Sequence, residues 1–164
     1  MLTLRKAATD DLAEITEIYN EAILNTTATF DPQPKTLVEQ KIWFLSHQPK
    51  YPILIAEQDN LIVGWASLSK WSDRCAYSGT AEVSLYVRKE YRGKGIGRQL
   101  LKSLLEEGKT ISLHIVIARA AGDNKASLSL FESEDFQKIG AMKEVGRKFD
   151  KLLDVHLMQK IYDT

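Results

Sequence analysis

The chain has 164 residues, a length typical of one domain, and we expect a single domain over residues 1–164 with no second catalytic domain. Its 22 basic and 22 acidic residues cancel, so no strong overall charge would attract nucleic acid or an acidic membrane surface. The expected partner is therefore a small molecule, with no nucleic acid and no membrane.

Cysteine usage and the N-terminus indicate the compartment. Cys75 is the only cysteine, which excludes an intramolecular disulfide and a zinc site made of cysteines. The first twelve residues lack the basic-then-apolar pattern of a signal peptide, and no run of about 18 apolar residues occurs. These features predict a cytoplasmic protein that needs no metal.

Hydrophobic patterning in the first half predicts a strand, two helices and a β-hairpin. Residues 2–4 alternate apolar with polar side chains like an edge strand, and apolar residues over 12–23 recur at helical spacing. Residues 36–47 begin with Thr and carry Glu three positions later, a capping box that starts a second helix. The β-rich runs 51–56 and 61–68 flank a short polar segment, as in a hairpin.

In the second half, strands and helices alternate. A helix from Gly95 carries an apolar stripe, and Gly108 is placed to end it. We assign the stripes Val38 to Phe44 and Leu100 to Leu105 to the core. The remaining predictions are strands over 81–87, 114–118, 138–145 and 152–161 and a helix over 124–134. The resulting order, β-α-α-β-β-β-α-β-α-β-β, indicates a mixed α/β domain.

The segment Glu90 to Arg98, EYRGKGIGR, lies between an apolar strand and an amphipathic helix. Glycines at alternate positions from 93 to 97 let successive backbone N–H groups point inward, and the following helix adds its positive N-terminal end. The segment therefore predicts a pyrophosphate-binding turn.

Two familiar phosphate motifs do not fit this turn. A Walker A loop needs Ser or Thr after Gly-Lys, whereas Lys94 is followed by Gly95. The dinucleotide fingerprint needs a third glycine where Arg98 or Leu100 stands. What remains is Arg-x-x-Gly-x-Gly over residues 92–97.

This pattern resembles the acetyl-CoA motif of the GNAT superfamily of N-acetyltransferases, Gln/Arg-x-x-Gly-x-Gly/Ala between a strand and a helix. The resemblance covers nearly the whole chain and is to the phosphinothricin acetyltransferase-like branch. It implies a GNAT-type α/β (α+β) fold, with a central, mixed, mostly antiparallel twisted sheet flanked by about four helices. With the β-rich final strands, it also implies a homodimer. The segments that carry it are 18–20, 27–30, 71–77, 80–87 and Asn124-x-x-Ser127.

Acetyl-CoA is the cosubstrate that the resemblance implies. The backbone of Leu85, Tyr86 and Val87 would line the pantetheine arm, and Asn124 and Ser127 would line the inner part of CoA. The pyrophosphate would meet the amides of the turn, formed by Arg92, Gly93, Lys94, Gly95, Ile96, Gly97 and Arg98.

Acyl transfer to an amine needs a neutral nitrogen, so a general base beside the thioester would help. Glu82 stands in a small, apolar stretch about three residues before the pantetheine segment, and the branch has its proposed base at the matching position. The alternative is an ordinary exposed strand glutamate or a salt-bridge partner. Phe131 occupies the position where many members carry a Tyr that would protonate the leaving thiolate, so no general acid is assigned.

Other reactive side chains are less well supported. Cys75 could form an acyl-enzyme, but no local His stands near it to support activation of the thiol, and packing or pocket lining is the preferred role. His47, His114 and His156 fall on separate elements without paired spacing, which favours structural roles.

Phe30, Arg74 and Tyr77 match residues of the branch that face the substrate. A guanidinium can hold a carboxylate or phosphinate bidentately. The predicted function is acetyl transfer to a small amino-acid-like amine of the phosphinothricin or methionine sulfoximine type. The alternatives are acetylation of a protein or peptide α-amine, and a CoA-binding protein without turnover.

Overall fold

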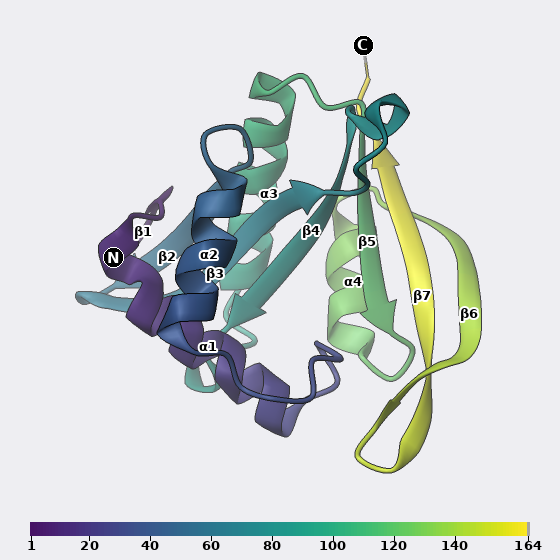
Figure 1. Cartoon of the computed structure of the whole chain (residues 1–164), viewed down its shortest axis with the longest axis horizontal. Coiled ribbons are helices and arrows are strands. Elements are labelled where there is room, and N and C mark those ends of the chain that lie inside the picture. Colours follow the sequence, from purple (N-terminus) through teal and green to yellow (C-terminus); the bar gives the residue numbers. More distant parts are fainter. Residues whose placement is uncertain (164) are drawn as a thin grey trace.

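The computed structural model describes residues 1–163 around one seven-stranded sheet (Figure 1). Among these described residues only β4 and β5 pair in parallel, and every other neighbouring pair of strands is antiparallel. This confirms the mixed, mostly antiparallel sheet. In spatial order the strands are β1 (Leu2–Lys6), β2 (Ile53–Gln58), β3 (Leu61–Lys70), β4 (Thr80–Val87), β5 (Ile115–Ala121), β7 (Lys151–Ile161) and β6 (Gln137–Lys148).

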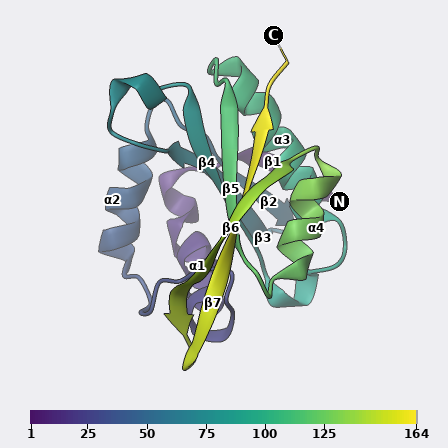
Figure 2. The same cartoon turned by 90° about the vertical axis from the view of Figure 1, so that its right-hand side faces the viewer.

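Four α-helices cover the sheet, two on each face (Figures 1 and 2). One face carries α1 (Leu12–Asn25) and α2 (Leu37–His47), and the other carries α3 (Ile96–Thr110) and α4 (Lys125–Ser133). The element order is the predicted one. None of the helices within residues 1–163 has the length and apolar character required to span a membrane.

β4 and β5 stay together over a short distance and then separate. Their registered pairs are Thr80–Glu82 with Ile115–Ile117, after which β4 remains on β3 and β5 remains on β7. Figure 1 shows the two strands diverging below this point. The inner backbone groups of both strands beyond the divergence therefore have no strand partner on that side and are free to bind something else.

The apolar stripe of α3 is core, as predicted: Leu100, Leu101 and Leu104 are fully buried against the sheet. The prediction that Gly108 ends this helix is wrong. α3 runs two residues past Gly108, which is buried inside the helix. A side chain at this position would collide with the hydroxyl of Tyr162, so the packing requires glycine here. That hydroxyl donates to the Leu105 carbonyl at 2.8 Å. Gly108 thus permits the Tyr162 side chain to approach the backbone of α3, and it does not end the helix.

The stripe assigned to the core of α2 is partly wrong. Val38 is 72% and Ile42 65% exposed. The buried face is instead formed by Gln40, Phe44 and His47, at helical spacing i, i+4, i+7. Thr36 caps this helix with the predicted box, and the cap fixes where the helix starts but not which face turns inward.

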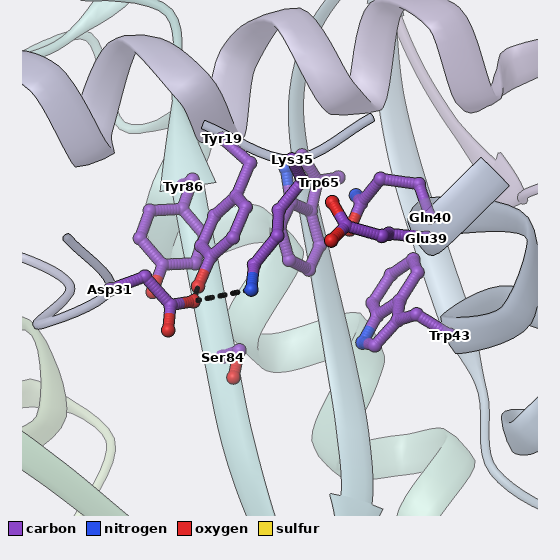
Figure 3. Close-up of a pocket in the computed structure, with 9 residues that line it drawn as sticks. All are labelled: Tyr19, Asp31, Lys35, Glu39, Gln40, Trp43, Trp65, Ser84 and Tyr86. Atoms are coloured by element: carbon purple, nitrogen blue, oxygen red, sulfur yellow. Dashed lines mark hydrogen bonds and ion pairs between the residues drawn. The ribbon is translucent and has the colours of Figure 1, made fainter. Parts of the chain in front are cut away.

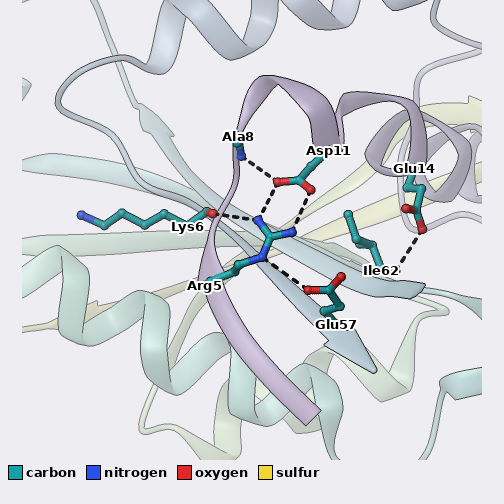
Figure 4. Close-up of polar contacts among 7 residues, drawn as sticks. All are labelled: Arg5, Lys6, Ala8, Asp11, Glu14, Glu57 and Ile62. Carbon is teal, nitrogen blue, oxygen red and sulfur yellow. Dashed lines mark hydrogen bonds and ion pairs between the residues drawn. The ribbon is translucent and has the colours of Figure 1, made fainter. Parts of the chain in front are cut away.

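A polar cluster joins the edge of the sheet to the start of α1 (Figure 4). Arg5 donates from its two terminal nitrogens to the carboxylate of Asp11 at 2.8 and 2.9 Å, and the same carboxylate accepts the Ala8 N–H at 2.7 Å. Arg5 also pairs with Glu57 on β2 at 3.4 Å. The Arg5 hydrogen bonds hold the pKa of Asp11 below its usual value, although burial opposes this.

Replacing Asp11 by Asn should lower the free energy of unfolding by about 1–2 kcal/mol at pH 7, a modest value because Arg5 is 39% exposed. Since the folded pKa of Asp11 is lowered, its contribution is complete above about pH 4 and is lost as the pH falls through the folded pKa. Urea unfolding from pH 7 to 2.5 should show the two curves converging in acid. The exposed neighbour Asp10→Asn is the control, and a pH-independent difference would contradict the assignment.

Candidate active site

A groove of about 720 Å³ runs between the lower half of β4, the glycine turn and the start of α4. Of the residues predicted to bind the cosubstrate, only Lys94 does not line it, since its ammonium lies over the ring of Tyr91, 5.2 Å from the centroid. The end of β4, the glycine turn and the start of α4 thus meet in one groove. The predicted residues that line it are Leu85, Tyr86, Val87, Arg92, Gly93, Gly95, Ile96, Gly97, Arg98, Asn124 and Ser127.

Glycine is required in the turn by backbone conformation. Gly93 and Gly95 have φ angles of 76° and 83°, in the left-handed region that L side chains rarely adopt. A Cβ at either position would have no atom within 4 Å, so the space above the turn is open. Gly95 is the N-cap of α3, and the first amides of that helix point toward the same space.

The arginines of the turn are anchored by acidic side chains. Arg92 donates to the Val87 carbonyl at 2.9 Å and to Glu21 of α1 at 2.7 Å. Arg98 donates to Glu134 at 2.9 Å. These two side chains therefore fix the shape of the turn, while the backbone amides remain available to a ligand.

Asn124 and Ser127 form the opposite edge of the groove. The Asn124 side chain accepts the Ser127 N–H at 3.2 Å and caps α4. This cap explains their spacing of three residues, and it places both at the groove edge.

A second cavity, of about 370 Å³, lies where β4 and β5 separate. It shares Leu85, Tyr86 and Ser127 with the groove, so the two spaces adjoin. Glu82, Phe30 and Phe131 also line it. The predicted base and the end of the predicted pantetheine segment therefore face one space.

Glu82 is paired with a residue that sequence reasoning missed. Its two carboxylate oxygens accept from Nε and Nη2 of Arg119 at 2.5 and 2.8 Å. The Glu82 side chain is 21% and that of Arg119 50% exposed. This hydrogen-bonded pair raises the pKa of Arg119. The sequence signal that could have identified Arg119 is its position as the one charged residue in the otherwise apolar strand β5.

Phe30 is held in the cavity wall by β6. Its ring packs so closely on Gly146 that any side chain there would collide with it. Lys148, at the end of the same strand, donates to the carbonyls of Thr26 and Thr29 at 2.6 and 2.7 Å. The chain between α1 and α2 is therefore tied to β6.

Arg74 and Tyr77 lie in the connection between β3 and β4 and are exposed. Neither lines the groove or the cavity that contains Glu82, so the structure does not bring them together with Phe30. Cys75 is exposed in the same turn.

Phe131 is buried against Phe136, with ring centroids 5.1 Å apart, and offers no hydroxyl to the cavity.

His47 is buried on α2, where its ring nitrogens contact the Trp43 carbonyl and the Ser69 hydroxyl, each at 2.8 Å. Burial lowers its pKa. These contacts are consistent with the predicted structural role of His47. His114 precedes β5 and His156 lies within β7.

A third cavity, of about 290 Å³, lies between α1, α2 and the sheet (Figure 3). Tyr19 donates to Asp31, whose carboxylate is 3.9 Å from the ammonium of Lys35. Burial is the main cause of a raised Tyr19 pKa. Ser84 and Tyr86 connect this space to the cavity of Glu82. Its residues are scattered along the sequence and gave no motif; they are Tyr19, Asp31, Lys35, Glu39, Gln40, Trp43, Trp65, Ser84 and Tyr86.

Comparison with known proteins agrees with this geometry. Residues 13–136 match the acetyltransferase (GNAT) family. The chain belongs to this family and is an acetyltransferase. It is 38% identical over 159 residues to the L-methionine sulfoximine/L-methionine sulfone acetyltransferase of Pseudomonas aeruginosa, covering 96% of this chain and 92% of that protein.

Solved structures of GNAT proteins have the same fold. The yncA protein of Salmonella typhimurium, solved with its cofactor acetyl-CoA, superposes with a TM-score of 0.96 at 35% identity, covering 99% of this chain and 94% of that one. A GNAT superfamily phosphinothricin acetyltransferase from Sinorhizobium meliloti, in complex with acetyl-CoA, gives 0.94 at 34% identity, covering 98% and 88%. The predicted family, branch and fold are thereby confirmed.

Proposed function

We propose that this GNAT enzyme transfers the acetyl group of acetyl-CoA to the amine of a small amino-acid-like molecule, with Glu82 as the general base. The observation that carries the proposal is the position of Glu82, in a cavity that opens onto the groove beneath the glycine turn. Two similar proteins were solved with acetyl-CoA, which supports the choice of cosubstrate. A third is named for methionine sulfoximine and methionine sulfone, which supports the class of acceptor.

The residues of the groove fit acetyl-CoA. Open space above Gly93 and Gly95, together with the free amides at the start of α3, suits a pyrophosphate. The unpaired inner edge of β4 from Leu85 to Val87 suits the amide groups of a pantetheine arm. When bound, acetyl-CoA supplies an acetyl thioester, whose carbon–sulfur bond is exchanged for a carbon–nitrogen bond to the acceptor.

Glu82 would take one proton from the acceptor ammonium and leave a nitrogen lone pair for the attack. For an α-amine with a pKa near 8, this deprotonation costs about 1.4 kcal/mol at pH 7. The nitrogen's second proton goes to the thiolate through water, because Phe131 carries no hydroxyl and a thiol pKa near 8.5 makes that step easy. The mechanism involves no metal.

The acceptor would lie against Phe30, with Arg74 and Tyr77 closing over it from the connection between β3 and β4. In the structure both side chains are exposed, and neither lines the cavity of Glu82. Their role therefore depends on movement of that turn, or on a second subunit.

Gly95→Val should weaken acetyl-CoA binding by at least about tenfold, because a β-branched residue is strained at a φ of 83° and its side chain enters the space of the pyrophosphate. Calorimetry should show this loss, and EDTA should change nothing. Gly140→Val, also at a glycine with open space around its Cβ, is the control. Unchanged affinity in Gly95→Val, or equal affinity of the wild type for ATP, would overturn the cosubstrate assignment.

Glu82→Gln keeps size and hydrogen bonding but cannot accept a proton, so kcat should fall by roughly 10²–10⁴ near pH 7. Acetyl-CoA affinity should hardly change. Raising the pH should partly restore the rate, since more of the amine is then neutral without help. Wild-type kcat/KM from pH 6 to 9 would show that another group is the base.

The edge strand β6, the turn after it and the start of β7 carry exposed apolar side chains, and we expect this surface to form a homodimer interface. Sedimentation at micromolar concentration should give twice the 18.6 kDa chain mass, and Val145→Lys should shift it toward monomer. A wild-type monomer would contradict this. The exposed residues are Ile139, Met142, Val145, Phe149 and Leu152.

A further inference from the structure

Arg119 is the single charged residue of β5, and it lies just beyond the point where β4 and β5 separate. Glu82 and Ile117 are the last registered pair, and Arg119 is two residues further along on the same face of the sheet. Its guanidinium holds both oxygens of Glu82, at 2.5 and 2.8 Å. The proposed base is thus bound to a fixed positive charge.

Both carboxylate oxygens of Glu82 accept a hydrogen bond from the guanidinium of Arg119. To take a proton from an acceptor ammonium, one of these oxygens has to turn toward that ammonium and away from Arg119. An acceptor that offers only an amine would therefore meet a base whose oxygens are already engaged.

Arg119 can bind a second anion. A guanidinium has five N–H donors, and Glu82 uses Nε and one terminal nitrogen. The Arg119 side chain is 50% exposed and lines the same cavity as Phe30. The ring of Trp71 lies 5.6 Å from its central carbon and supports it independently of Glu82.

We propose that Arg119 binds the carboxylate of the acceptor, and that this contact loosens its hold on Glu82. The inference rests on the proposed function, in which Glu82 is the base. In an α-amino acid the amine and the carboxylate share one carbon, so a carboxylate on Arg119 brings the ammonium next to Glu82. One proton then moves from the ammonium nitrogen to a Glu82 oxygen, and the neutral amine remains. The acceptor class is therefore α-amino acids, and simple amines are discriminated against.

The test compares two acceptors that differ only in the carboxylate, L-methionine sulfone and 3-(methylsulfonyl)propylamine. In Arg119→Gln, kcat/KM for the sulfone should fall by about 10²-fold, because a charged hydrogen-bonding partner is lost. For the simple amine it should rise by about 2–10-fold, because Glu82 is released. Arg119→Lys, which keeps the charge without the fork, should retain part of the sulfone activity. Lys41→Gln, the same charge change on exposed α2, should alter neither.

In Arg119→Gln, kcat/KM should change in opposite directions for the two acceptors, whereas a merely structural role of Arg119 would lower both values. Equal losses for both, or no loss for the sulfone, would overturn the inference and leave the proposed acetyl transfer standing. In a Glu82→Gln background, Arg119→Gln should still lower the sulfone rate but no longer raise the amine rate; a persisting rise would overturn the release of the base. If the wild type acetylates neither compound, the proposed acceptor class fails, and this inference fails with it.

Discussion

The separation of β4 from β5 after three registered pairs is the constraint on which the rest of the site depends. Backbone groups that a continuous sheet would pair are left open along one edge of each strand, in a protein whose interior otherwise satisfies them. The glycine turn at the end of β4 and the capped start of α4 then close the two ends of the opening. A ligand bound there can replace the missing strand contacts.

Charge pairs hold the parts of this opening in place. Glu14, Glu17 and Glu21 follow one face of α1, and they anchor Arg88 and Arg92 on either side of the short turn that leads into the glycine segment. These pairs are partly exposed, so each is worth little on its own. Their effect is positional, because they orient the arginines toward α1 and leave the helix amides to the ligand.

One wall of the cavity around Glu82 is fixed by β6, near the end of the chain. β6 has a register shift between Met142 and Gly146. Within it, the Asp154 carboxylate accepts the Glu144 N–H at 2.8 Å, and this hydrogen bond lowers the pKa of Asp154. The shifted strand presents Gly146 to the ring of Phe30. The cavity around Glu82 therefore depends on β6, the same strand that carries the proposed dimer surface.

The order of elements, the glycine turn and the candidate base could all be predicted from the sequence, because they depend on local signals. Apolar periodicity predicted the strands and helices, and the left-handed conformations of the turn were expected from its glycines. The position of Glu82 beside the groove followed from its place on one strand, three residues ahead of Leu85.

Contacts between distant segments were decided only by the tertiary structure. Arg119 lies 37 residues from Glu82, and their pairing depends on the register of β5 against β4, which no local pattern encodes. Lys148 reaches the carbonyl of Thr26 across 122 residues. The inward face of α2 was likewise set by packing, since both of its faces carry apolar residues and burial selects one. Local chemistry thus determined the elements and the motif, and strand order and packing determined which charges meet in the site.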